Sequence, residues 1–270
     1  MIQKETLVEA LREKGYNTKC DTIVKNGDVE LQAIHFLETN SQLSPTIYID
    51  QILQMDSVDE ACEAVINIYK CRPPFSVDLN QITDKDFILE SVRIGVQKVS
   101  NQAGIKRSTE YDGIEQYLYY GEDEWSIRLT DEILKSAGIT NKNKLWDVAR
   151  KNTFKHTTIK SMLELMREMM GDDFPAEQFG GPDLDMWVIS NDKSIKGASA
   201  ILDKEFLTGF AHKHGFQKIA ILPSSIHEAI LLEVTEEISI DYLDDMVREV
   251  NSTQVEPTDR LIDHAIIVNF

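Results

Sequence analysis

The residues best suited to chemistry lie in one short stretch, Ser224-Ser225-Ile226-His227-Glu228. A serine hydroxyl, an imidazole and a carboxylate are the three groups of a hydrolase triad. The apolar runs on either side predict β-strands, in which alternate residues share a face. Ser225 and His227 then point to one side and Glu228 to the other, so contiguous residues cannot complete a triad. A hydrolase using Ser225 and His227 at the sheet edge stays open as the alternative function; in the simpler interpretation the serines bond the turn backbone.

Other chemical motifs are incomplete. His227-Glu228 begins the zinc-protease pattern H-E-x-x-H, but Leu231 stands where the second histidine is required. The chain contains neither a Walker loop nor the pattern G-x-G-x-x-G, and its 3 cysteines lack C-x-x-C spacing. The sequence therefore predicts no cofactor, no metal site and no disulfide framework.

Charge limits the classes of partner. The chain has 270 residues and a formal net charge of -18, which argues against direct binding to nucleic acid or to an anionic membrane surface. Its apolar runs are far shorter than the roughly 20 residues of a membrane helix. The first residues follow an amphipathic helix pattern and do not resemble a signal peptide. We therefore expect a soluble, cytoplasmic protein whose partner, if it has one, is basic.

Acidic residues are densest between Glu228 and Asp263. Most such charge keeps a protein soluble, but it can also form a docking surface. Helical spacing would gather a set of carboxylates on one side of a predicted helix over residues 241–251, while Leu243 and Val247 face the sheet. The predicted partner-binding residues are Glu237, Asp241, Asp244 and Asp245.

The most apolar stretch, Phe216 to Val234, predicts the centre of the fold. Two runs rich in Ile, Leu and Val, residues 217–222 and 226–234, are separated by turn residues and indicate adjacent strands. We expect Ile221 and Ile230 to be buried. The predicted class is α+β (mixed α/β), with a central, largely antiparallel sheet covered by helices.

Turn and cap signals divide the rest of the chain. Asn26-Gly27 favours a hairpin between residues 18–25 and 29–38. Ser57 and Glu60 form a capping box at the start of a helix. A second hairpin is expected over residues 116–129, and residues 87–99 turn from helix to strand after Ser91. Further helices are predicted at 142–151 and 157–170. The second of these carries Met162, Leu165, Met166 and Met169 on one side, as core or, alternatively, as an adaptable binding surface.

The loop-like segment 172–185 is rich in Gly, Pro and Asp and is the predicted linker or flap. It divides the chain into an N-terminal α+β half, residues 1–171, and a C-terminal α+β half, residues 186–270, which contains the central strands. One continuous domain is the alternative. A strand at 186–190, a helix at 198–214 and a final strand at 261–270 are expected in the second half.

Several stretches resemble one bacterial family. They are LSPTIYID at 43–50, RLTDEILKSAGIT at 128–140, LWDVARKNT at 145–153, ILPSSIHEAILL at 221–232 and MVREVNSTQVEPTDRLIDH at 246–264. Their pattern is similar to domain of unknown function 5688, common in gut Firmicutes. Leu261-Ile262-Asp263 replaces the family's usual Leu-Ser-Asp. The resemblance implies an intracellular bacterial protein of a mobile element or phage, and it implies no reaction.

The sequence thus favours an acidic interaction protein. Its expected role is to bind or inhibit a basic, nucleic-acid-binding protein, whose groove the acidic surface would occupy as a nucleic-acid mimic. The hydrolase remains the alternative, because an active site assembled from distant residues leaves no spacing in the sequence.

Overall fold

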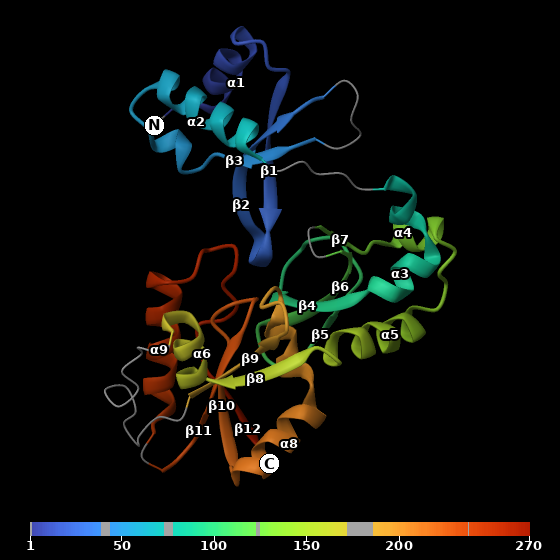
Figure 1. Ribbon diagram of the computed structural model, residues 1–270, viewed down its shortest axis with the longest axis vertical. Helices are drawn as coiled ribbons and strands as arrows, with labels where there is room; N and C mark the ends of the chain where they lie inside the picture. Colours follow the sequence, from blue (N-terminus) through green and yellow to red (C-terminus); the bar gives the residue numbers. More distant parts are fainter. Residues whose placement is uncertain (1, 39–43, 73–77, 123–124, 172–185, 237) are drawn as a thin grey trace. The chain divides into compact units, whose positions relative to one another are not determined.

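Figure 1 shows the computed structural model of the chain, which describes residues 2–38, 44–72, 78–122, 125–171, 186–236 and 238–270. Its contacts separate two compact units, Met1–Val77 and Asp78–Phe270. Both combine helices with antiparallel sheet, as predicted: every pairing between strands of the described residues is antiparallel. The chain therefore has a mixed α+β fold.

The first unit is a three-stranded sheet covered by two helices. The predicted hairpin is present as β1 (Thr18–Lys25) and β2 (Val29–Phe36), joined at Asn26–Asp28, where Gly27 adopts a φ of 65°. β3 (Thr46–Tyr48) pairs with β2. α1 (Lys4–Glu13) and α2 (Val58–Cys71) pack their apolar sides into one core with this sheet. Ser57 caps α2 by accepting a hydrogen bond from the Glu60 backbone N–H.

The second unit begins with a four-stranded sheet. α3 (Lys85–Ser91) leads directly into β4 (Arg93–Lys98), so the predicted change from helix to strand after Ser91 is confirmed. β4 and β5 (Lys106–Ser108) flank the long strand β6 (Ile114–Gly121), which also pairs with β7 (Ser126–Arg128) in the second predicted hairpin. α4 (Asp131–Ser136) and α5 (Lys142–Phe154) follow and bury Leu134, Leu145 and Trp146.

A five-stranded sheet forms the rest of the second unit, in the order β12-β10-β11-β9-β8. Its strands are β8 (Thr157–Ser161), β9 (Met186–Asn191), β10 (Lys218–Leu222), β11 (Ala229–Glu233) and β12 (Ile266–Asn269). β10 and β11 are the two predicted central strands, paired antiparallel, but β11 begins at Ala229 and not at residue 226 as predicted. Ile221 is fully buried, as expected, whereas Ile230 is only partly buried.

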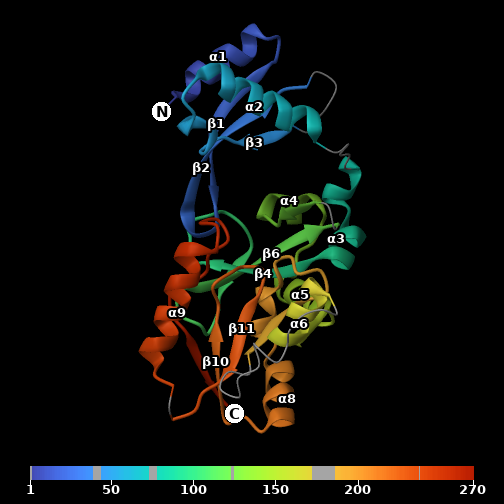
Figure 2. The same cartoon turned by 60° about the vertical axis from the view of Figure 1, so that its left-hand side comes forward.

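Two helices cover opposite faces of this sheet (Figure 2). Ile219 and Ile221 join a core with residues of α8 (Lys204–His214), which follows a 3₁₀ segment at Gly197–Leu202. Ala220 and Leu222 point the other way and pack with Leu243 and Val247 of α9 (Ile240–Thr253). The alternation of side chains along β10 therefore separates two layers of core.

The predicted helix over 157–170 is wrong in its first turn and a half. Residues 157–161 are β8, and only Met162–Met170 form a helix, α6. β-Branched Thr157, Thr158 and Ile159 suit an extended chain, and pairing with β9 supplies their backbone hydrogen bonds. Met169 is 85% exposed, so it is not a core residue.

The predicted linker 172–185 lies outside the described residues. The strands on either side of it, β8 and β9, are neighbours in the same sheet. The two compact units divide after Val77, a position inside the predicted N-terminal half, residues 1–171.

Candidate functional site

The five-stranded sheet has two outer strands among the described residues, β12 and β8, and the edge at β12 borders a pocket. β12 pairs with β10 through Ile266↔Ile221 to Asn269↔Lys218, and among the described residues it has no second neighbour. An edge strand presents unpaired backbone groups that can pair with another chain. β12 is therefore a template for an added strand.

The hydrogen-bond pattern identifies which backbone groups point outward. The Phe270 N–H donates to the Gln217 carbonyl at 3.0 Å, which makes that position a hydrogen-bonded pair. In an antiparallel ladder such pairs alternate with non-bonded ones, so Ile266 and Val268 also direct their backbone groups to β10. Ile267 and Asn269 therefore direct their N–H and C=O groups away from the sheet, to the open edge.

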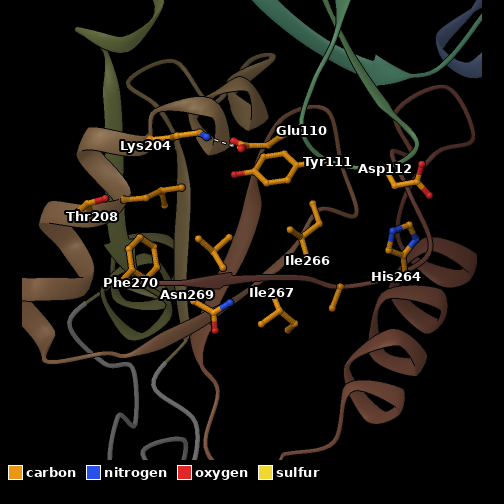
Figure 3. A pocket seen from close by; sticks show the side chains of 13 residues that line it. Glu110, Tyr111, Asp112, Lys204, Thr208, His264, Ile266, Ile267, Asn269 and Phe270 are labelled. Atoms are coloured by element: carbon orange, nitrogen blue, oxygen red, sulfur yellow. Dashed lines mark hydrogen bonds and ion pairs between the residues drawn. The ribbon is translucent and has the colours of Figure 1, made fainter.

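A pocket of about 590 Å³ runs along this edge (Figure 3). Residues 264–270 form one wall, Lys204, Leu207 and Thr208 of α8 contribute a second, and Glu110, Tyr111 and Asp112 a third. In Figure 3 the side chains of Ile266 and Phe270 lie on the side of Tyr111, while Ile267 and Asn269 point the opposite way. An ion pair between Lys204 and Glu110 closes the upper rim, and the Tyr111 hydroxyl donates to the Ile201 carbonyl at 3.0 Å.

The acidic helix α9 reaches the end of the same edge. Asp244 Oδ1 accepts a hydrogen bond from the Ala265 backbone N–H at 2.8 Å. Ala265 directly precedes β12 and has the same parity along the chain as Ile267 and Asn269. A carboxylate of α9 thus bonds the first outward-facing donor at the position where the open edge begins. Asp244 therefore ties α9 to the start of the open edge.

The predicted acidic residues have different surroundings in the structure. Asp241 and Asp245 are exposed on α9. The side chain of Asp244 is only 19% exposed and has a structural role through Ala265. Arg248 donates to Asp245 at 2.7 Å and lies 3.7 Å from Asp244, so it offsets part of the charge. Glu237 lies outside the described residues.

Two large side chains accompany these carboxylates. Ile240 and Tyr242 at the start of α9 are 53% and 54% exposed. Exposed single apolar residues are ordinary, but aromatic rings are enriched at protein interfaces. The exposed side of α9 therefore offers both charge and apolar contact area.

Ser225 and His227 lie close in the chain, and the Ser225 hydroxyl bonds the backbone of His227 and not its ring. Ser225 is buried, and its hydroxyl accepts the His227 backbone N–H at 3.0 Å. The imidazole Nδ1 accepts the Lys196 backbone N–H at 3.2 Å, and Nε2 lies 3.6 Å from Asp259 Oδ2. The described hydrogen bonds thus give the ring structural partners, and a hydrolytic role for Ser225 with His227 stays a prediction.

Glu228 lies next to this imidazole and is partly buried. Burial raises the pKa of the Glu228 carboxyl, the charge of Asp259 raises that pKa further, and His227 opposes both. The neutral form of the Glu228 carboxyl is thus favoured over the charged form at this position. The group lies where residues 224–226 meet residues 259–261 through the Ser225↔Arg260 bridge and the hydrogen bond from the Ile226 N–H to the Asp259 carbonyl.

Sequence reasoning missed the open edge because its chemistry belongs to the backbone. Residues 261–270 predicted a strand, but nothing in their side chains indicates that this strand is last in the sheet. The strand order, in which β12 lies beside β10, comes from a crossover connection that depends on long-range packing. The only sequence signal was the concentration of acid just before it.

Comparison with known proteins identifies the family and nothing further. Residues 3–267 match the model of the family of unknown function DUF5688, so the chain belongs to that family. No curated protein and no solved structure matches it. No helix within the described part of the chain is long and apolar enough to cross a membrane.

Proposed function

We propose that this protein binds an extended, basic segment of a partner protein along the open edge of β12. The observation that carries the proposal is the outward direction of the Ile267 and Asn269 backbone groups beside a pocket of about 590 Å³. An added strand would exchange hydrogen bonds with those groups, while its alternate side chains enter the pocket. Main-chain bonds would supply affinity, and the pocket would supply selectivity.

Charge supports a basic partner. The chain carries a net charge of -18, and Asp241 and Asp245 are exposed on α9, the helix whose Asp244 bonds the Ala265 N–H just before β12. Asp112 adds a carboxylate to the pocket wall. Complementary charge mainly accelerates association and excludes partners of the wrong sign. A nucleic-acid-binding protein fits this description, because its basic surface receives closely spaced negative charge; occupying that surface would inhibit it.

The test uses defined peptides before any natural partner. A short peptide in which lysine alternates with valine should bind, and the same peptide with glutamate in place of lysine should not. Affinity should fall as salt is added, because exposed charges are screened. Calorimetric titration measures both. Equal affinity for the two peptides would contradict the role of charge.

The variant Ile267→Pro tests whether the peptide binds at the open edge of β12. Proline removes the outward N–H, and it is tolerated on edge strands because that N–H does not pair with β10. We expect the lysine–valine peptide to bind at least about tenfold more weakly. Ile267→Val keeps the N–H and serves as the matched control, with affinity near that of the original chain. Undiminished binding by Ile267→Pro, with its fold intact by circular dichroism, would refute strand addition at β12.

A further inference from the structure

A second pocket of the same unit has the opposite electrostatic character. Its volume is about 320 Å³, and it lies at the start of β4, the end of β6, the start of β7 and the end of β9. Arg93, Lys193 and Lys196 line it with His156, against the carboxylates of Glu122 and Asp192. Asp192 is bonded to His156 Nδ1 at 2.7 Å. Three cationic side chains against two carboxylates make this pocket positive at neutral pH, in a chain whose net charge is -18.

Lys196 is held in an unfavourable backbone conformation. Its φ of 53° and ψ of 27° are left-handed, a region that non-glycine residues seldom adopt. Ser194, two residues earlier, has a φ of 52°. Such strain persists where the surrounding structure fixes it, and it concentrates at binding and catalytic sites. The loop that follows β9 therefore has the backbone strain typical of a functional loop.

Specific contacts fix this loop. Asn191 Oδ1 accepts the backbone N–H groups of Lys193 and Ile195 at 3.0 and 3.3 Å, and Asn191 Nδ2 donates to the Ile195 carbonyl. The Lys196 N–H donates to His227 Nδ1. Any side chain at Gly197 would collide with Ser190 Oγ, 2.1 Å from the position of the added Cβ. The loop is thus closely packed on the end of β9.

The charged head of Lys196 is directed across the pocket. Its Nζ lies 4.5 Å from the centre of the Tyr119 ring and bonds Ser126 Oγ. Arg93 is the direct cross-strand neighbour of Tyr119. Two cations are thereby arranged around one aromatic ring. Trp125 adds a second aromatic wall and is stacked on Phe87, with ring centres 5.7 Å apart.

We infer that this pocket binds a small phosphate ester with a planar, aromatic body. Arg93, Lys193 and Lys196 would receive the phosphate, since a guanidinium and ammonium groups are the side chains that bind phosphate best. Tyr119 and Trp125 would contact the ring. The volume suits a small ligand, because it lies near the lower limit of roughly 300 Å³ for ligand pockets. This site is separate from the edge of β12, and its ligand is independent of the proposed peptide.

Phenyl phosphate is the probe. Calorimetric titration should show it binding more tightly than inorganic phosphate, which lacks the ring, and more tightly than phenol, which lacks the charge. If phenol bound with the same affinity as phenyl phosphate, the proposed role of the cations would be overturned. Inorganic phosphate binding equally well would overturn the role of the aromatic wall. Absence of any phenyl phosphate binding would overturn the site.

Two variants locate the binding. Lys193→Met removes an exposed cation and should weaken phenyl phosphate binding several-fold with no change in melting temperature. Lys196→Gly removes the central cation and also relieves the left-handed strain, so affinity should fall about tenfold while the fold is retained. Lys135→Met, at an exposed position of α4 outside the pocket, is the matched control and should bind as the original chain does. Unchanged affinity in both pocket variants would refute the assignment.

Discussion

The β12 edge and the loop that follows β9 belong to the same five-stranded sheet, yet they recognise partners by different means. At β12 the available groups are backbone N–H and C=O groups, and the surrounding charge is negative. After β9 the available groups are side chains, the charge is positive, and the backbone is strained. Backbone recognition needs only a strand with no outer neighbour, whereas side-chain recognition needs a loop held in one conformation. The strain is therefore confined to the second region.

His227 connects the two regions. Its Nδ1 accepts the Lys196 N–H of the strained loop, and its Nε2 lies beside Asp259, in the segment that leads from α9 to β12. The Ser190 hydroxyl also donates to the His227 carbonyl at 2.8 Å. A residue that the sequence offered as a catalytic base thus has the contacts of a structural connector between two candidate sites.

The largest expected effect is on the core that both regions share. Ile221 is fully buried on β10, between β12 and β11, so Ile221→Ala should lower the free energy of unfolding by roughly 2 to 5 kcal/mol. Peptide and phenyl phosphate binding should decline together as the folded fraction falls. Ile230→Ala, at a partly buried position, should cost less. Denaturant titration checks the order, and equal losses would contradict it.

A smaller effect separates the two regions by charge. The double variant Asp241→Lys, Asp245→Lys reverses two exposed charges. At low salt it should weaken binding of the lysine–valine peptide by about 1 kcal/mol, which is roughly fivefold in affinity. Phenyl phosphate binding should not change. Asp244 is excluded from this variant because its bond to Ala265 is structural, so reversing it would disturb the fold. A salt-independent loss, or loss of both ligands, would show that the effect is not electrostatic.

Much of the fold was predictable because its signals are local. Asn26-Gly27, Ser57 with Glu60, and the apolar runs around Pro223 act within a few residues, and each predicted element is present. The sequence predicts a helix over β8, because three β-branched residues are a short local signal and the pairing partner β9 lies beyond residue 185.

The candidate sites were predictable only in part. Acid on α9 is visible in the sequence, since helical spacing places Asp241 and Asp245 on its exposed side. The open edge depends on strand order, which no residue type encodes. The cationic pocket collects Arg93, Tyr119 and Lys196 from segments far apart in the chain, and the positive φ of Lys196 occurs in a loop held by the His227 imidazole and by the close approach of Gly197 to Ser190.

The smallest effect concerns charge at the connection between the regions. Burial raises the pKa of Glu228 above its ordinary value of 4.5. The folded state therefore binds a proton on the Glu228 carboxyl more tightly than the unfolded state does. The stability that this proton supplies is therefore present at low pH and is lost as pH rises through the window between 4.5 and the higher folded pKa. Glu228→Gln stays neutral, and it should melt above the original chain at neutral pH and close to it below that window. Melting curves at both pH values measure the difference, with the exposed Glu236→Gln as control, which should shift little at either. A stabilisation by Glu228→Gln of the same size at both pH values would mean that packing, and not the buried charge, limits this junction.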